Sequence, residues 1–112
     1  MLIKRGDIWL ANLDPTIGNE IKKTRPVVIV SNNINNLHNN VVSVLPMTSN
    51  TDKIFSFEVF IPKGIANVPK DSKIKADQIR TIDKSRLSKR LGNIPDNFIT
   101  AIDKAIKIHL SL

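Results

Sequence analysis

The sequence predicts a mainly β protein, built as one small and strongly bent barrel-like sheet with a single helix at the C-terminus. Short apolar runs such as Val27–Val30 and Val41–Leu45 are separated by turns rich in proline, glycine and asparagine, which is typical of barrels made of short strands. From Phe98 to Leu110, apolar residues recur at helical spacing instead. Because 112 residues suffice for one core of ordinary size, we expect a single domain over residues 1–112.

Six strands are expected before the helix. They are Ile8–Leu13, Val27–Ser31, Val41–Leu45, Phe55–Ile61, Ser72–Ile79 and Arg86–Leu91. The run Val27–Ser31 is apolar without alternation, which predicts burial on both of its faces. Phe55–Ile61 alternates, which predicts a half-exposed strand with Ser56 and Glu58 on the face opposite the apolar residues. Arg80–Lys84 is expected to form a turn.

The C-terminal helix is expected to start at Pro95, which fits the first helical position, while Asp96 complements the positive end of the helix. Its apolar residues form one stripe, and His109 falls on that stripe, so we expect this histidine to be a partly buried packing residue. The other histidine, His38, lies in the asparagine-rich segment Asn32–Asn40, which reads as a loop or a single helical turn. It is expected to be solvated.

Composition excludes several classes of protein. The net charge of +7 favours a polyanionic partner such as a nucleic acid. No apolar run approaches the ~20 residues that span a bilayer, and the N-terminus lacks the apolar centre of a signal peptide, so we expect a cytoplasmic protein with no membrane partner. There is no cysteine, no local histidine pair, no phosphate-binding glycine loop and no G-x-S-x-G motif. We therefore expect neither a metal nor a cofactor.

Polar side chains gather at the expected strand ends and in the adjoining loops. They are Glu20, Arg25, Thr48, Ser49, Lys75, Asp77 and Gln78. Arg25 stands directly before Pro26, and a residue in that position is held in an extended conformation, so its guanidinium is mounted at the mouth of a buried strand. Taken alone, Arg25 is better explained as a solvated strand end, because exposed charge is the default for arginine. The polar loop Thr16–Thr24 leads into it and is of the kind that often carries binding residues.

Such a set suits RNA cleavage without a metal. The RNA brings its own nucleophile, the 2′-hydroxyl group, so the protein must hold the phosphate and offset the charge that develops on it. Arg25 can donate two hydrogen bonds to phosphate oxygens, and Thr48 can add a neutral donor. Oriented donors of this kind can be the largest catalytic contribution.

Four blocks of the sequence, in order, resemble the MazF/PemK (Kid-like) toxins of bacterial toxin–antitoxin systems. They are RGDIWLANLDPTIGNE, TRPVVIVS, PMTS and ADQIRTIDKSRL. The resemblance implies a small SH3-like barrel of the MazF/PemK/CcdB type that forms a homodimer. It also implies a metal-independent, sequence-specific endoribonuclease that cleaves single-stranded RNA, including mRNA, and so inhibits translation and growth. Its implied partner is a cognate antitoxin whose acidic C-terminal segment occupies the RNA groove.

The resemblance assigns roles to individual residues. Arg25 and Thr48 match the catalytic pair of chromosomal members, and Asp77 matches a catalytic aspartate of the plasmid-borne branch. Glu20 matches the acidic residue of the first loop. Arginine effectively never deprotonates, so Arg25 is expected to bind phosphate and stabilise the transition state. The general base is left open between Glu20 and Asp77.

The remaining candidates are expected to bind RNA. They are Asn19, Lys22, Lys23, Ser49, Lys75 and Gln78. The chain departs from the family pattern at several of them: the plasmid-borne branch has arginine at the position of Lys75 and histidine at that of Asn19. Many relatives have glycine where this chain has Lys22, Lys23 and Thr24, so a stiffer and more basic loop is expected. The RNA-reading residues are expected in the loops Thr16–Thr24 and Asn50–Ile54.

Two alternatives belong to other classes of function. A noncatalytic nucleic-acid-binding barrel would bind RNA in a salt-dependent way without creating new RNA ends. A gyrase-poisoning toxin would share the general fold. Toxins of that kind rely on a C-terminal tail with a tryptophan, whereas this chain ends Ile-His-Leu-Ser-Leu, which counts against that reading.

Overall fold

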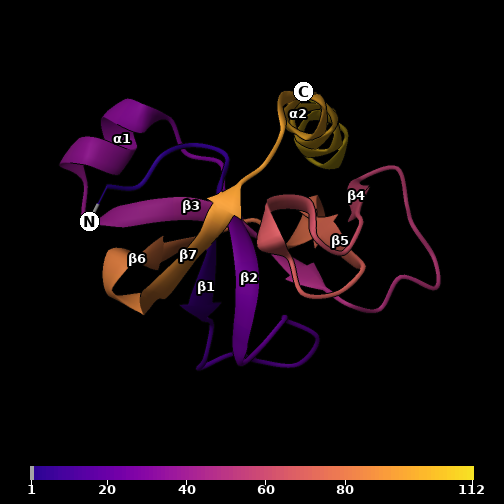
Figure 1. Cartoon of the computed structure of the whole chain (residues 1–112), viewed down its shortest axis with the longest axis horizontal. Coiled ribbons are helices and arrows are strands. Elements are labelled where there is room, and N and C mark those ends of the chain that lie inside the picture. Colours follow the sequence, from indigo (N-terminus) through magenta and orange to yellow (C-terminus); the bar gives the residue numbers. More distant parts are fainter. Residues whose placement is uncertain (1) are drawn as a thin grey trace.

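The computed structural model of the protein describes residues 2–112. Within these residues, seven strands alternate with turns and two α-helices (Figure 1). The strands are β1 (Asp7–Asn12), β2 (Thr24–Ile29), β3 (Val41–Thr48), β4 (Glu58–Ile61), β5 (Ser72–Lys75), β6 (Arg80–Asp83) and β7 (Leu87–Asn93). The helices are α1 (Asn33–His38) and α2 (Asp96–Leu110). The predicted class, mainly β with a C-terminal helix, is confirmed.

The strands pair in the order β4-β5-β3-β2-β1-β7, with β6 also on β3, and every pairing is antiparallel. The end strands β4 and β7 do not pair with each other, so the barrel is not closed. Helix α2 lies beside the β4–β5 end of the sheet (Figure 1) and contacts β4 and the turn that follows β5. Neither helix within residues 2–112 has the length and the apolar run that a bilayer span requires.

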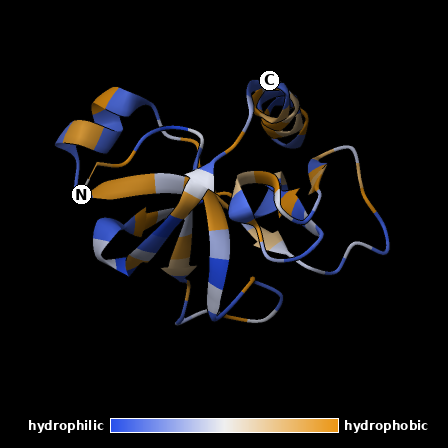
Figure 2. Ribbon diagram, viewed as in Figure 1, coloured by the Kyte–Doolittle hydropathy of each residue, from blue (hydrophilic) through white to orange (hydrophobic). Residues whose placement is uncertain are grey.

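Strand β2 is buried on both faces, as its unbroken apolar run predicts. Val27, Val28 and Ile29 are completely buried. Val28 belongs to the apolar cluster that contains Ile102 of α2, whereas Val27 and Ile29 belong to a second cluster on the opposite face, around Trp9. Figure 2 shows the hydrophobic stretches in the strands of the sheet, and hydrophobic and hydrophilic residues mixed along both helices. β2 is therefore a rigid central element.

Both β2 and β3 are longer than predicted at the ends that carry the candidate residues. Arg25 lies inside β2, opposite Ala11 of β1, and Pro26 lies opposite Leu10. Strand β3 continues through Pro46 as far as Thr48. Arg25 and Thr48 are consequently fixed by strand pairing and not by loops.

The predicted strand Ser72–Ile79 and the predicted turn Arg80–Lys84 are wrong in their boundaries. The strand ends at Lys75, a 3₁₀ turn occupies Ala76–Gln78, and Arg80–Asp83 forms β6. Along β3, Met47 pairs with Ile74 and Val44 with Arg80, so two residues of β3 stand opposite five, 75–79. One of the two is Pro46, which has no backbone N–H to donate to a neighbouring strand, and the chain bulges into a turn opposite it.

The predicted strand Phe55–Ile61 is shorter, and its facing is partly wrong. Only Glu58–Ile61 is a strand; Val59 and Ile61 are buried as expected. Glu58, expected on the exposed face, is buried, and Phe55 is 45 % exposed. A carboxylate tolerates burial only when it is paired and hydrogen-bonded, and two lysines of β5 supply those partners to Glu58.

Helix α2 presents the predicted apolar stripe, with Ile102 and Ala105 buried against the sheet. The expectation for His109 is wrong. The helix extends past the sheet, so His109 is exposed, with its ring 6.4 Å from that of Phe57. His38, at the end of the short helix α1, is exposed as expected.

Candidate active site

Arg25 and Thr48 line the same hollow, which has a volume of about 220 Å³ and is called here the Arg25 hollow. Ser49 lines it as well, together with Lys70, which precedes β5, and Ser72, the first residue of β5. The Arg25 Nε donates to the Lys22 carbonyl at 3.2 Å, which orients the guanidinium. Its two terminal nitrogens make no hydrogen bond within residues 2–112 and are available to an oxyanion.

A second hollow of about 390 Å³, the middle hollow, adjoins the first because Thr48 lines both. Its other lining residues are Asn19, Ile21, Asn50, Lys73, Lys75, Asp77 and Gln78. A third, the outer hollow of about 470 Å³, shares Asn19, Asp77 and Gln78 with the middle one and adds Glu20 and Arg80. The three hollows form one groove, which runs from the end of β2 across the end of β3 to the turn after β5.

The groove brings together most of the candidates that are far apart in the sequence. Two are not part of it: Lys22 and Lys23 are exposed and line none of the three hollows. Lys23 has a φ of 68°, a left-handed conformation that favours glycine. The loop therefore holds a lysine in a backbone conformation that costs free energy.

The two candidate bases lie at different distances along the groove from Arg25. Neither Glu20 nor Asp77 lines the Arg25 hollow, but Asp77 shares the middle hollow with Thr48. Glu20 lines only the outer hollow and accepts a hydrogen bond from the Ile17 amide at 2.7 Å. The Asp77 Oδ1 atom is buried, forms no hydrogen bond within residues 2–112, and lies 3.6 Å from Lys75 Nζ. Asp77 is thus the better placed of the two.

Gln78 holds the loop between β1 and β2 against the turn after β5. Its Oε1 accepts from the Ile21 amide at 2.7 Å and its Nε2 donates to the Asn19 carbonyl at 3.1 Å. Both ends of its amide group are therefore occupied by the loop that carries Asn19 and Glu20. This geometry makes Gln78 a clamp on one wall of the groove.

Replacing Gln78 by alanine should release this loop. Each hydrogen bond contributes about 1 kcal/mol, so the loop should open more often while the sheet stays folded. We expect trypsin to cleave after Lys22 and Lys23 several times faster than in the wild type, with little change in melting temperature. Gln78→Glu is the matched control, since it keeps the acceptor for Ile21 and loses only the donor; cleavage of both variants at the wild-type rate would contradict the clamp.

Sequence reasoning missed the ion network beneath the middle hollow. The Glu58 carboxylate accepts from Lys75 Nζ at 2.6 Å and from Lys73 Nζ at 3.2 Å. Burial alone would raise the pKa of the Glu58 carboxyl, but hydrogen bonds from Lys75, the Phe55 backbone and Lys73 outweigh it and lower that pKa. The pKa of Lys75 shifts in the opposite direction. Burial alone would lower it, but the interactions with Glu58 and Asp77 outweigh burial and raise it. The spacing of Lys73 and Lys75, two apart in a strand and so on one face, was the available signal.

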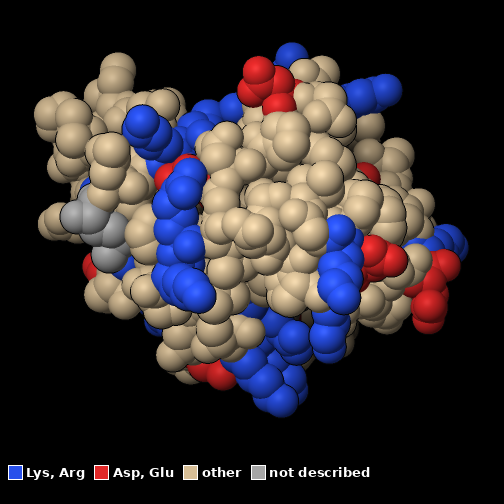
Figure 3. All heavy atoms as spheres, viewed as in Figure 1, with Lys and Arg blue, Asp and Glu red and all other residues tan. Residues whose placement is uncertain are grey.

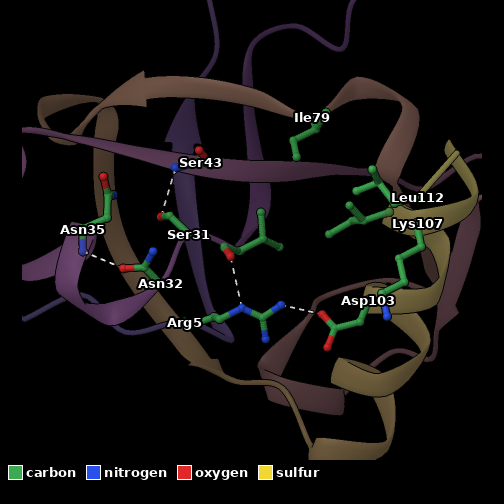
Figure 4. Close-up of a pocket in the computed structure, with 11 residues that line it drawn as sticks. Arg5, Ser31, Asn32, Asn35, Ser43, Ile79, Asp103, Lys107 and Leu112 are labelled. Atoms are coloured by element: carbon green, nitrogen blue, oxygen red, sulfur yellow. Dashed lines mark hydrogen bonds and ion pairs between the residues drawn. The ribbon is translucent and has the colours of Figure 1, made fainter. Parts of the chain in front are cut away.

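A larger hollow lies elsewhere in the described chain. It measures about 660 Å³ and contains none of the candidate residues. Figure 4 shows Arg5 at its centre, where the guanidinium donates to the Val30 carbonyl at 3.1 Å and pairs with Asp103 of α2 at 2.5 Å. These contacts join α2 to the sheet, so this hollow is a seam between two elements.

Basic side chains are distributed in several groups over the face seen in Figure 3. One group lies at the lower edge, where Figure 1 draws the loop between β1 and β2. Among residues 2–112, no three His, Cys, Asp or Glu side chains lie close enough together to hold a metal ion. The polar lining of the groove consists of cations, hydroxyls and amides, with carboxylates in the middle and outer hollows and none in the Arg25 hollow.

Comparison with known proteins places the chain among relatives of known class. The chain is 36 % identical to the endoribonuclease MazF9 of Mycobacterium tuberculosis, with 99 % of this chain and 98 % of the relative covered. It is 34 % identical to the endoribonuclease EndoA of Bacillus subtilis, with 100 % and 97 % covered. The crystal structure of MazF from Deinococcus radiodurans matches the fold with a TM-score of 0.86 at 23 % identity, covering 100 % of this chain and 99 % of that one.

A family profile also covers nearly the whole chain. It is described as the PemK-like, MazF-like toxin of type II toxin–antitoxin systems, and it matches residues 4–110. The matched span includes both ends of the groove and the helix that supports it. With the relatives at more than a third identity over their full length, the chain belongs to the family of PemK-like, MazF-like toxins.

Proposed function

We propose that this protein is the toxin of a type II toxin–antitoxin system and acts as a metal-independent, sequence-specific endoribonuclease on single-stranded RNA. Cleavage of mRNA would stop translation and growth. The observation that carries the proposal is that Arg25 and Thr48, from different strands, line one hollow with the terminal guanidinium nitrogens unoccupied within residues 2–112. The whole of residues 1–112 acts as one endoribonuclease domain.

In this mechanism the substrate's 2′-oxygen attacks the adjacent phosphorus atom, and the bond from phosphorus to the 5′-oxygen breaks. The 5′-oxygen takes a proton from solvent water as it leaves, so the products are a 2′,3′-cyclic phosphate and a 5′-hydroxyl group. Arg25 binds the scissile phosphate and stabilises its developing charge, and the hydroxyls of Thr48 and Ser49 add neutral donors. Asp77 takes the proton from the 2′-hydroxyl in preference to Glu20, since it shares a hollow with Thr48.

The rest of the groove binds the nucleotides on either side. Asn19, Lys75 and Gln78 form the walls of the middle hollow, and the exposed Lys22 and Lys23 extend the positive surface toward the RNA backbone. RNA of this kind is read as unstacked single strands, which fits an open groove. A cognate antitoxin with an acidic C-terminal segment would occupy the same groove, and the toxin would act as a homodimer in the cytoplasm.

Cleavage should proceed fully in the presence of EDTA and should require a 2′-hydroxyl at the cut site. The test is digestion of a varied panel of single-stranded RNAs with purified protein, followed by mapping of the new ends and of their chemistry. A substrate with a single 2′-deoxy nucleotide at the mapped site should resist cleavage completely, because the nucleophile is then missing, while neighbouring 2′-deoxy positions serve as controls.

Two results would contradict the proposal. Salt-dependent binding of RNA without any new ends would favour the noncatalytic barrel. Cleavage of the 2′-deoxy substrate at the mapped site would exclude attack by the 2′-oxygen.

A further inference from the structure

Glu58 is a buried carboxylate beneath the middle hollow of the groove. Its side chain has no exposed surface, and it accepts hydrogen bonds from Lys75 Nζ, Lys73 Nζ and the Phe55 amide. Both lysines line the middle hollow. An apolar cluster of similar volume is often at least as stable as a buried ion network, so stability alone does not account for this arrangement.

The same network holds the loop 49–57 between β3 and β4. Lys73 Nζ donates to the Lys53 carbonyl at 2.7 Å, and the Phe55 amide donates to Glu58 at 2.9 Å. The loop's other hydrogen bonds are local, such as that from the Asn50 amide to the Thr48 hydroxyl. The course of the loop therefore depends on Glu58 and Lys73.

Charges in and under the middle hollow balance. Lys73 and Lys75 face Glu58 and Asp77, whereas the Arg25 hollow contains Arg25 and Lys70 with no carboxylate. A phosphate is favoured where positive charge is uncompensated. The balanced middle hollow, with Asn50 and Asn19 on its walls, suits the neutral base and sugar of a nucleotide.

We propose that Glu58 is a positioning residue for substrate selection: it holds Lys75 and the loop 49–57 so that the middle hollow accepts the base next to the scissile phosphate. This inference rests on the proposed function. Glu58 itself touches neither the phosphate nor the RNA and acts through the groups that it fixes. Its loss should therefore change KM and base selectivity more than kcat.

The experiment uses the full-length Glu58→Gln variant in steady-state cleavage assays. The substrates are a fluorescein-labelled RNA with the mapped cleavage site and matched RNAs with one base changed on either side of the cut. For the mapped site we expect KM to rise roughly tenfold and kcat to change less than about twofold, the tenfold ratio being that of about 1.4 kcal/mol. Selectivity against the changed base should fall by a similar factor.

Asp7→Asn is the matched control. Asp7 is also a buried carboxylate, bound by Arg90 and Asn93, but it lies at the end of β1 away from Ala11, which pairs with Arg25. We expect this variant to lower the melting temperature and to leave KM and selectivity unchanged.

A second variant separates positioning from stability. In Glu58→Leu/Lys73→Met/Lys75→Met, apolar residues replace the whole network. We expect this variant to have a melting temperature close to that of the wild type but not the selectivity of the wild type. Recovery of selectivity together with stability would overturn the proposal, as would wild-type KM and selectivity in Glu58→Gln. If the wild type cleaves no RNA, the proposed function fails separately, and the variants are compared by binding of 2′-O-methyl RNA. An unchanged Kd in Glu58→Gln would then overturn this inference.

Discussion

Replacing Arg25 by alanine should lower kcat/KM for RNA cleavage by about a thousandfold while the protein stays folded. The guanidinium lines the hollow that also contains Thr48, and its terminal nitrogens make no hydrogen bond within residues 2–112. Loss of one oriented donor to a developing oxyanion costs about 10²–10³ in rate, and the loss of a full positive charge belongs at the upper end. The measurement is single-turnover cleavage of an RNA that carries the mapped site.

Two comparisons make this result specific. Arg25→Lys keeps the charge but not the two-pronged geometry, so it should recover only part of the rate. Lys104→Ala removes one positive charge from the exposed face of α2 and should leave cleavage unchanged. A small effect of Arg25→Ala, close to that of Lys104→Ala, would remove Arg25 from the mechanism.

Replacing Ile102 by alanine should have the largest effect on stability. Ile102 is 1 % exposed and joins α2 to the cluster that contains Ile8 and Val28. Truncation of such a side chain costs about 2–5 kcal/mol, a large part of the roughly 5–15 kcal/mol that stabilises an ordinary domain. The free energy of unfolding, measured by urea titration, should fall by this amount.

The Ile102→Ala substitution should also disturb the groove, because α2 contacts the turn that carries Asp77 and Gln78. Ile108→Ala on the same helix is the control: Ile108 is 41 % exposed, so its loss should cost less than about 1 kcal/mol. Ile102→Val, which removes a single methyl group, should cost about 0.5–1.5 kcal/mol. Equal destabilisation by Ile102→Ala and Ile108→Ala would show that α2 is not anchored as described.

Local sequence patterns predicted the elements whose environment is uniform along their length. The apolar run of β2 and the stripe of α2 are of this kind, because burial on one or both faces leaves a regular trace in the sequence. The prediction failed between residues 55 and 83, where environment changes from one residue to the next. Pro46 forces a turn into the predicted strand Ser72–Ile79, and nothing in that segment alone signals the interruption.

In the candidate site, too, the sequence indicated the residues whose placement follows from their near neighbours and missed those whose placement depends on distant contacts. Arg25 was noticed because its extended backbone is dictated by the proline that follows it, and Thr48 because it ends a buried strand. Gln78 was expected to contact RNA, but its amide is engaged by the loop at Asn19 and Ile21. Glu58 was assigned to the exposed face because it alternates with the apolar residues of Phe55–Ile61.

By itself, then, the sequence determined the mainly β class, the central buried strand, the C-terminal helix and the extended backbone that carries Arg25. Each of these depends on steric preferences and on hydrophobic periodicity, which act between near neighbours in the chain. Only the tertiary structure decided that Arg25 and Thr48 line one hollow, that Gln78 clamps the loop at Asn19, and that Glu58 is buried beside two lysines. These arrangements depend on strand register and on which charges lose their water together, and both are set by contacts between residues far apart in the sequence.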